Sequence, residues 1–224
     1  MPIFKDVNKD FFKKWTPNMS YVLGFFAADG YITLNKRNAN FWCIQIKDNK
    51  LLQEIRKAVG SNHKISERFN NKYKTTLYRL QIGSKEMCDD LRKLGFYEGK
   101  TKNLSVPNVP SKYFKDFIRG YFDGDGNVWS GLVHKERAKP LLTIRCVFTS
   151  CSKQFLLDIH ERLLCFGVSG GVLSKGQGNY YRLTYSAKST LIFYDFVYNG
   201  IVKDSSGLHL ERKKRIFDKY RMQL

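Results

Sequence analysis

Proline, cysteine and histidine are scarce in this sequence, with 5, 5 and 4 residues among 224. The cysteines are odd in number and form no C-x-x-C pair, so the sequence gives no sign of a disulfide framework or a cysteine-based zinc site. Most of them lie in apolar segments, where cysteine acts as a small buried side chain. The four histidines lack the spacing of metal ligands, and we expect each at the surface or at a loop tip: His63, His134, His160 and His209.

Long apolar runs are also absent. Nowhere do about 18 uncharged apolar residues follow one another, which is the length that a membrane-spanning helix needs. The charged start MPIFKDVNKDFFKKW lacks the continuous apolar core of a secretory signal. We therefore expect an intracellular protein, cytoplasmic or organellar, that is neither secreted nor membrane-spanning.

Acidic residues are outnumbered, with 20 Asp and Glu against 39 Lys and Arg, so that the formal net charge is +19. Such an excess attracts polyanions, of which nucleic acid is the commonest. The basic residues occur throughout the chain and not in one tail, which favours a nucleic-acid partner over a protein that is merely basic. Hydrophobic residues make up 42% of the chain, enough for a folded core.

The chain repeats itself. VLGFFAADG (22–30) recurs as IRGYFDGDG (118–126), and YRLQIGSK (78–85) recurs as YRLTYSAK (181–188). Between these pairs, DNKLLQEIRKAVG (48–60) resembles SKQFLLDIHERLLCFG (152–167), and both are amphipathic helices that end in glycine. Three matches in the same order indicate two halves of one fold. We place them at residues 1–105 and 106–224.

Each half has the order α-β-β-α-β-β-α, an α+β fold with a four-stranded antiparallel sheet. The motif segments predict helices over about 18–28 and 113–124. Polar and apolar residues alternate over 41–47 and 141–150, as in a strand with one buried face. Paired strands are expected over 63–70 with 74–83, and over 170–175 with 179–186.

The polar face of each sheet suits DNA, because Arg, Gln, Lys and Thr can donate to base edges while hairpin-tip residues hold phosphates. The alternative is an ordinary solvated face, but segments 35–47 and 68–79 carry seven Lys or Arg and no acidic residue. The predicted face residues are Gln45, Lys47, Arg79, Gln81, Thr143, Arg145, Arg182 and Thr184. The predicted tip residues are Asn35, Lys36, Arg37, Arg68, Lys72, Lys74, His134, Lys135, Arg137, Lys139 and Lys175.

Small residues lie four apart in both motif helices: Gly24 with Ala28, and Gly120 with Gly124. Residues at this spacing share a helix face. Small side chains on that face let two helix backbones approach closely. We expect the two motif helices to pack through these faces about a pseudo-twofold axis, which makes the chain a monomer with internal symmetry.

Both motif helices end in Asp-Gly. We expect Gly30 and Gly126 in the left-handed conformation that ends many helices, with Asp29 and Asp125 side by side. Two close carboxylates repel, and Mg²⁺ suits them because it binds carboxylates, water and phosphate oxygens. Two such ions at a phosphodiester would activate water and stabilise the leaving oxygen. The alternative is a plain helix-ending turn in each copy.

With these two motif copies the chain resembles the LAGLIDADG homing endonucleases of the single-chain, two-motif type. The resemblance covers nearly the whole chain and extends to LERKKRIFDKY (210–220), which is similar to the basic terminal helix of many relatives. It implies two saddle-shaped sheets on a long, nearly palindromic or asymmetric DNA site. Both strands are then cut across the minor groove.

The resemblance also implies site residues and cofactors. Asp29 and Asp125 would bind metal together with the backbone carbonyls of Ala28 and Gly124. Mg²⁺ or Mn²⁺ would support cleavage, and Ca²⁺ would bind without supporting it. The matching lysines after the fourth strands, which organise solvent in relatives, are Lys85 and Lys188.

The two halves differ at the motif itself, where Ala27 corresponds to Asp123. Ile46 and Ser150 stand where some relatives have a polar residue, often Gln, so the two strands are expected to be cut at unequal rates. Two other interpretations remain: a maturase or regulator that binds RNA or DNA without cutting it, and an endonuclease from an intein. We do not expect the intein origin, because Met1 is not a splicing-type Cys or Ser. An H-N-H or zinc nuclease is not expected, given the histidine spacing.

Overall fold

The computed structural model describes residues 5–72, 74–99, 104–199 and 207–223. Its contacts divide the chain into two compact units. The first contains Met1–Lys100 with Pro107–Tyr121, and the second contains Thr101–Val106 with Phe122–Leu224. The predicted boundary after residue 105 separates the two sequence repeats and not these contact units, and it stays a prediction.

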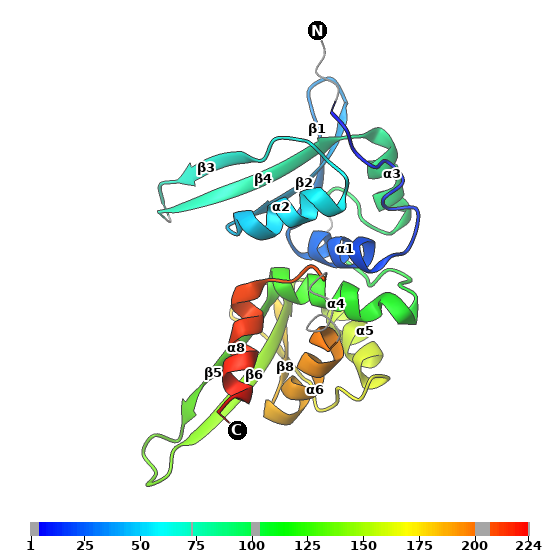
Figure 1. Ribbon diagram of the computed structural model, residues 1–224. Helices are drawn as coiled ribbons and strands as arrows, with labels where there is room; N and C mark the ends of the chain where they lie inside the picture. Colours follow the sequence, from blue (N-terminus) through cyan, green and yellow to red (C-terminus); the bar gives the residue numbers. More distant parts are fainter. Residues whose placement is uncertain (1–4, 73, 100–103, 200–206, 224) are drawn as a thin grey trace. The chain divides into compact units, whose positions relative to one another are not determined.

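The first unit is built on a four-stranded antiparallel sheet with the strand order β1-β2-β4-β3. Its elements are α1 (Pro17–Asp29), β1 (Gly30–Leu34), β2 (Asn40–Ile46), α2 (Asn49–Ala58), β3 (Ser66–Asn70), β4 (Thr75–Gly83) and α3 (Lys85–Lys93). All three helices contact the sheet (Figure 1). Thr16, Asp48 and Ser84 cap their first turns by accepting backbone N–H groups.

Alternation along the strands puts one face of this sheet into the core. Trp42, Ile44, Leu80 and Ile82 are fully buried on the face that the helices cover. Phe26 of α1 packs edge-on against Trp42, at 6.3 Å between ring centroids. Burial of large apolar side chains of this kind is the main stabilising contribution to the fold, about 1.5–3 kcal/mol for each side chain.

The second unit repeats the arrangement with the strand order β5-β6-β8-β7. Its strands and the helices that contact them are β5 (Gly126–Val133), β6 (Leu141–Ser150), α5 (Lys153–Leu164), β7 (Val172–Lys175), β8 (Tyr181–Tyr185), α6 (Ala187–Tyr198) and α8 (Glu211–Arg221). The second motif helix, α4 (Ser111–Asp125), runs from the first unit into the second. Phe122, Phe148 and Phe193 form an aromatic cluster under the sheet.

The predicted α+β order is confirmed in both halves, with α8 as a further helix at the basic segment 210–220. The helices α2 and α5 are followed by glycine, as predicted, and both glycines are in the left-handed region, with φ of 64° at Gly60 and 80° at Gly167. Among the described helices, none is long and apolar enough to cross a membrane.

One hairpin in each unit extends beyond the rest of its sheet (Figure 1). Thr75–Leu77 of β4 pair with β3 alone, and residues 141–145 of β6 pair with β5 alone. The long arm is therefore formed by the third and fourth strands in the first half, and by the first and second strands in the second. The repeated sequences build unequal arms.

Candidate nucleic-acid interface and motif helices

The helix-free face of the first sheet carries the polar residues that the alternation predicts. Gln45 lies opposite Arg79, and Cys43 lies opposite Gln81, so all four share this face. Tyr31 completes the row beside Cys43, and its side chain interacts with Arg79. Burial raises the pKa of the Cys43 thiol, which keeps it neutral. The face is therefore cationic and rich in hydrogen-bond donors around Arg79.

The helix-free face of the second sheet is hollowed by a depression of about 350 Å³. Trp129 and Arg145 are cross-strand partners here, and the guanidinium carbon of Arg145 lies 5.2 Å from the Trp129 ring centroid. This stacking restricts the guanidinium before any ligand binds. The residues that line the depression are Asn127, Trp129, Arg145, Val147, Thr149, Arg182 and Thr184.

A second guanidinium on this face, that of Arg182, is also held by a neighbouring aromatic residue. Arg182 lies opposite Thr149, and it donates a hydrogen bond of 3.0 Å to the hydroxyl of Tyr180. Its guanidinium carbon also lies 5.1 Å from the Tyr180 ring centroid. The sequence reasoning found both arginines but missed Trp129 and Tyr180. The alternation of Asn127, Trp129 and Gly131 along their strand was the signal for the former.

All the predicted tip residues are exposed. Asn35 has a structural task there, because its Oδ1 accepts hydrogen bonds from the backbone N–H groups of Arg37 (2.8 Å) and Ala39 (2.9 Å). Lys74 and His134 have positive φ, of 44° and 53°, at the turns of their hairpins. Lys47 follows the end of β2 and is exposed too. The tips thus present cations along both units.

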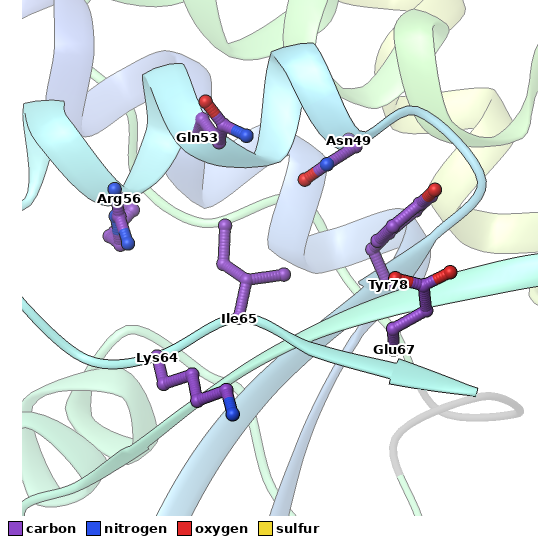
Figure 2. Close-up of a pocket in the computed structure, with 7 residues that line it drawn as sticks. All are labelled: Asn49, Gln53, Arg56, Lys64, Ile65, Glu67 and Tyr78. Carbon is purple, nitrogen blue, oxygen red and sulfur yellow. The ribbon is translucent and has the colours of Figure 1, made fainter.

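Another depression, of about 240 Å³, lies on the helix-covered side of the first sheet (Figure 2). It opens between α2 and the strands β3 and β4, and its lining mixes both charges with an apolar side chain. The lining residues are Asn49, Gln53, Arg56, Lys64, Ile65, Glu67 and Tyr78. Since this side of the sheet is the one that the helices cover, the depression is separate from the polar face.

The motif helices approach each other closely within the first unit, as the small residues predict. A Cβ on Gly24 would lie 2.8 Å from the carbonyl carbon of Phe117 in α4. One on Gly120 would lie 2.9 Å from the carbonyl carbon of Tyr21 in α1. The Ser20 hydroxyl also donates a hydrogen bond of 2.8 Å to the Tyr113 carbonyl. Glycine is needed at both positions because backbone atoms occupy the space of a side chain.

The expectation of a left-handed glycine after each motif helix is wrong. Gly30 is extended, with φ −91° and ψ 156°, and Gly126 is not among the residues with positive φ. The reason for glycine is again lack of space. A Cβ on Gly30 would lie 2.5 Å from Cγ of Phe26, and one on Gly126 would lie 2.8 Å from Cε2 of Phe122. These rings pack over the backbone where each helix turns directly into a strand.

Asp29 and Asp125 are the last residues of α1 and α4. Asp29 is half-buried and Asp125 is exposed. Ala28 and Gly124 directly precede them, and the last carbonyls of a helix have no partner within the helix. Carboxylate and carbonyl oxygens are the hard donors that Mg²⁺ prefers, so the residues present at each helix end fit this cation. That the two aspartates act together stays a prediction.

Lys85 and Lys188 both lie in the first turn of the helix after the fourth strand, and both are exposed. Lys85 forms an ion pair of 2.6 Å with Asp89 on its own helix, and its side chain is 78% exposed. An exposed pair at this spacing contributes little to stability, so the lysine can leave it at small cost. Their solvent-organising role stays a prediction.

The histidine prediction is wrong for His63, which is buried and hydrogen-bonded to the Ser61 hydroxyl at 2.9 Å. Its burial lowers the pKa of the imidazole. His160 is half-buried and lies 2.8 Å from the Tyr185 hydroxyl. In the parts of the chain that are described, no group of three or more His, Cys, Asp or Glu residues could hold a metal ion. The five cysteines are free thiols, and Cys165 is exposed.

A family model described as the LAGLIDADG-like domain matches residues 16–94 and again residues 115–197. The chain belongs to the LAGLIDADG-like domain family. The two matches cover both motif helices and both sheets, so the predicted family membership and the two-sheet α+β fold are confirmed.

Solved structures share the LAGLIDADG fold. The homing endonuclease I-WcaI bound to its DNA recognition sequence has a TM-score of 0.60 and 16% identity, over 92% of this chain and 90% of that one. I-SmaMI bound to uncleaved DNA in the presence of calcium ions has a TM-score of 0.55 and 14% identity, over 93% and 90%. I-DmoI in complex with DNA and Mn has a TM-score of 0.52 and 16% identity, over 85% and 97%.

Two proteins are similar to this chain in sequence. An uncharacterized protein of Methanocaldococcus jannaschii is 23% identical over 212 residues, which are 89% of this LAGLIDADG chain and 70% of that protein. A probable translation initiation factor IF-2 of Thermococcus kodakarensis is 35% identical over 103 residues. That match covers 42% of this chain and only 8% of the initiation factor.

Proposed function

We propose that this protein is a site-specific endonuclease that cuts both strands of double-stranded DNA with the help of a divalent cation. Its site would be long, and asymmetric or pseudo-palindromic. The family, and the solved homing endonucleases bound to DNA, with calcium or with manganese, support the proposal. The observation that carries it is that each motif helix ends at an aspartate, directly before a sheet whose open face presents arginine.

Asp29 and Asp125 are the proposed metal ligands, each with a carbonyl of its own helix end, from Ala28 and Gly124. Mg²⁺ bound there would activate water and stabilise the leaving oxygen of the phosphodiester. The chain itself positions the substrate, because cations at the hairpin tips contact phosphates and side chains on the open faces contact base edges. Addition of Mg²⁺ to a duplex selected for binding tests the proposal through the cleavage of both strands.

The guanidinium groups of Arg145 and Arg182, each stacked on a neighbouring aromatic ring, predict part of the recognition sequence. Arg182 pairs with Thr149, four residues beyond Arg145 on β6. At about 3.4 Å per residue and about 4.8 Å between strands, the two arginines are roughly 14 Å apart. With strands that follow the major groove, this spans about four base pairs at about 3.4 Å each. Because arginine prefers the O6 and N7 acceptors of guanine, we expect two guanines about four base pairs apart in one half-site.

Arg145→Ala should weaken binding to the selected site by about 1–3 kcal/mol and relax the preference at one guanine. Competition binding against a randomised duplex library measures both effects.

Lys139→Ala, at a hairpin tip, should instead weaken binding to all sequences alike and reduce the salt dependence of binding by about one counterion. Lys153→Ala is the matched control on α5, which covers the opposite face of the sheet. Equal effects of Arg145→Ala and Lys153→Ala would contradict the interface.

Lys85→Met should reduce cleavage by at least about tenfold while DNA affinity falls by less than about threefold, as expected for a residue that organises solvent at the metal. Single-turnover cleavage and binding in Ca²⁺ separate the two effects. The matched variant Asp89→Asn removes the ion pair and keeps Lys85, so it should cleave normally. Equal losses of cleavage and affinity would make Lys85 an ordinary phosphate contact. The same comparison applies to Lys188→Met.

A further inference from the structure

A buried ammonium group lies at the end of the second motif helix, within the second unit. Lys213, in the first turn of α8, is only 3% exposed. Its Nζ donates to the carbonyl oxygens of Phe122 (2.6 Å), Asp123 (2.8 Å), Gly124 (3.3 Å) and Gly126 (2.5 Å). It also lies 5.2 Å from the centroid of the Phe122 ring. Sequence reasoning missed it, because nothing in the basic segment 210–220 distinguishes one lysine from the others.

This position has a physical reason. The last carbonyls of a helix have no partner within the helix, and they form the negative end of its dipole. A buried charge must in turn be hydrogen-bonded and compensated. Lys213 meets both needs, since its ammonium lies among carbonyls on both sides of Asp125. It acts as an internal cation at this helix end.

A second contact anchors α8 at the same place. Asp123 is 1% exposed, and its carboxylate accepts hydrogen bonds from the backbone N–H of Leu210 (2.8 Å) and the hydroxyl of Tyr198 (3.3 Å). Leu210 is the N-cap residue that directly precedes α8. The start of α8 and the end of α4 are thus joined by one carboxylate and one ammonium, so that a shift of either segment breaks both contacts.

We propose that Lys213 is a positioning residue for the nuclease centre, which sets the backbone on both sides of Asp125 and the direction of the Gly124 carbonyl. The inference rests on the proposed function. Lys213 acts through the backbone that carries the metal ligand, and its hydrogen bonds to Gly124 and Gly126 flank that ligand directly. Supporting groups of this kind typically change metal affinity or activity by about 10–100-fold when they are removed.

Lys213→Met keeps an unbranched side chain that is one heavy atom shorter, and it removes the donors. Amide hydrogen exchange on the full-length protein without DNA should show faster exchange over residues 122–127. With the selected duplex, the Mg²⁺ concentration for half-maximal cleavage should rise by about tenfold or more, while affinity for DNA in Ca²⁺ is unchanged. Exchange reports on the positioning alone, and the Mg²⁺ requirement reports on its consequence for cleavage.

Phe217→Leu is the matched control, because Phe217 is buried in the same helix against Phe122, Tyr194 and Tyr198 and does not bind the carbonyls. It reduces the ring packing of α8 and keeps the ammonium and its hydrogen bonds, so it should leave the Mg²⁺ requirement unchanged. If Lys213→Met does not fold, Asp123→Asn takes its place. That variant keeps the shape of the Leu210 anchor, removes its charge, and should raise the Mg²⁺ requirement by a smaller factor.

An unchanged Mg²⁺ requirement in Lys213→Met, or one that rises equally in Phe217→Leu, would overturn the inference while leaving the nuclease proposal intact. Faster exchange spread evenly over α6, α8 and β5 would also overturn it. If the wild-type protein bound the duplex and failed to cut it, the nuclease proposal would fail instead. The exchange experiment would then still decide whether Lys213 positions the backbone around Asp125.

Discussion

Asp29→Asn or Asp125→Asn should reduce DNA cleavage by at least about 10³-fold, because loss of a metal-binding carboxylate removes several kcal/mol of transition-state stabilisation. Asparagine has nearly the same shape, so binding to the selected duplex in Ca²⁺ should change by less than about tenfold, or ~1.4 kcal/mol. Single-turnover cleavage with each strand labelled separately measures the loss in both strands.

The control for this experiment is Asp158→Asn on α5, a surface carboxylate that accepts a hydrogen bond from Gln154 at 2.7 Å. It removes the same charge on the helix-covered side of the second sheet and should cleave normally. Cleavage at wild-type rates by either Asp29→Asn or Asp125→Asn would show that the carboxylate at that helix end does not hold the catalytic metal.

Gly24→Ala and Gly120→Ala should each destabilise the protein by about 3 kcal/mol or more, which corresponds to a fall in Tm of roughly 6–12 °C. Helix propensity alone favours alanine by about 1 kcal/mol, so the two effects have opposite signs. The clash should win, because the added Cβ meets backbone atoms of the facing helix, which cannot rotate away. Thermal and denaturant unfolding of the full chain measure the difference.

Gly178→Ala serves as the control, since its Cβ would stand at an ordinary distance of 3.4 Å from the Tyr180 ring. Its Tm should stay within about 2 °C of the wild type, as for most surface substitutions. A Gly24→Ala variant as stable as the wild type, or more stable, would contradict the close packing of α1 against the first part of α4.

The sequence predicted the topology well because the repeat doubles every signal. A single Asp-Gly helix end has little meaning, but two copies at corresponding places define two halves. Alternation along 41–47 and 141–150 then correctly assigned Gln45 and Arg145 to the open faces. Such patterns arise among residues that are close together in the sequence, so they can be recognised in one sequence alone.

The errors and omissions depend on contacts that are distant in the sequence. Gly30 and Gly126 looked like left-handed helix ends, but rings one turn earlier exclude a side chain there. His63 looked like a surface residue and is buried. Lys213 looked like one basic residue in a basic helix, and its role depends on carbonyls about 90 residues earlier in the chain, as the separations of 87 to 91 residues show.

The inequality of the two halves has a structural basis beyond the motif. Ala27 has only a methyl group where Asp123 anchors Leu210 and Tyr198. The long hairpin arms are also formed by different strand pairs. We therefore expect the two half-sites to differ in sequence and the two strands to be cut at different rates.

The proposed function requires that the sheets bind one DNA site and that the same chain cuts it. The most direct measurement selects a duplex from a randomised library in Ca²⁺ and then adds Mg²⁺ to the purified complex. We expect cleavage of both strands within the selected site, with unequal rates. A duplex that stays bound and intact at every Mg²⁺ and Mn²⁺ concentration would contradict the proposed nuclease function and identify the protein as a binding member of the family.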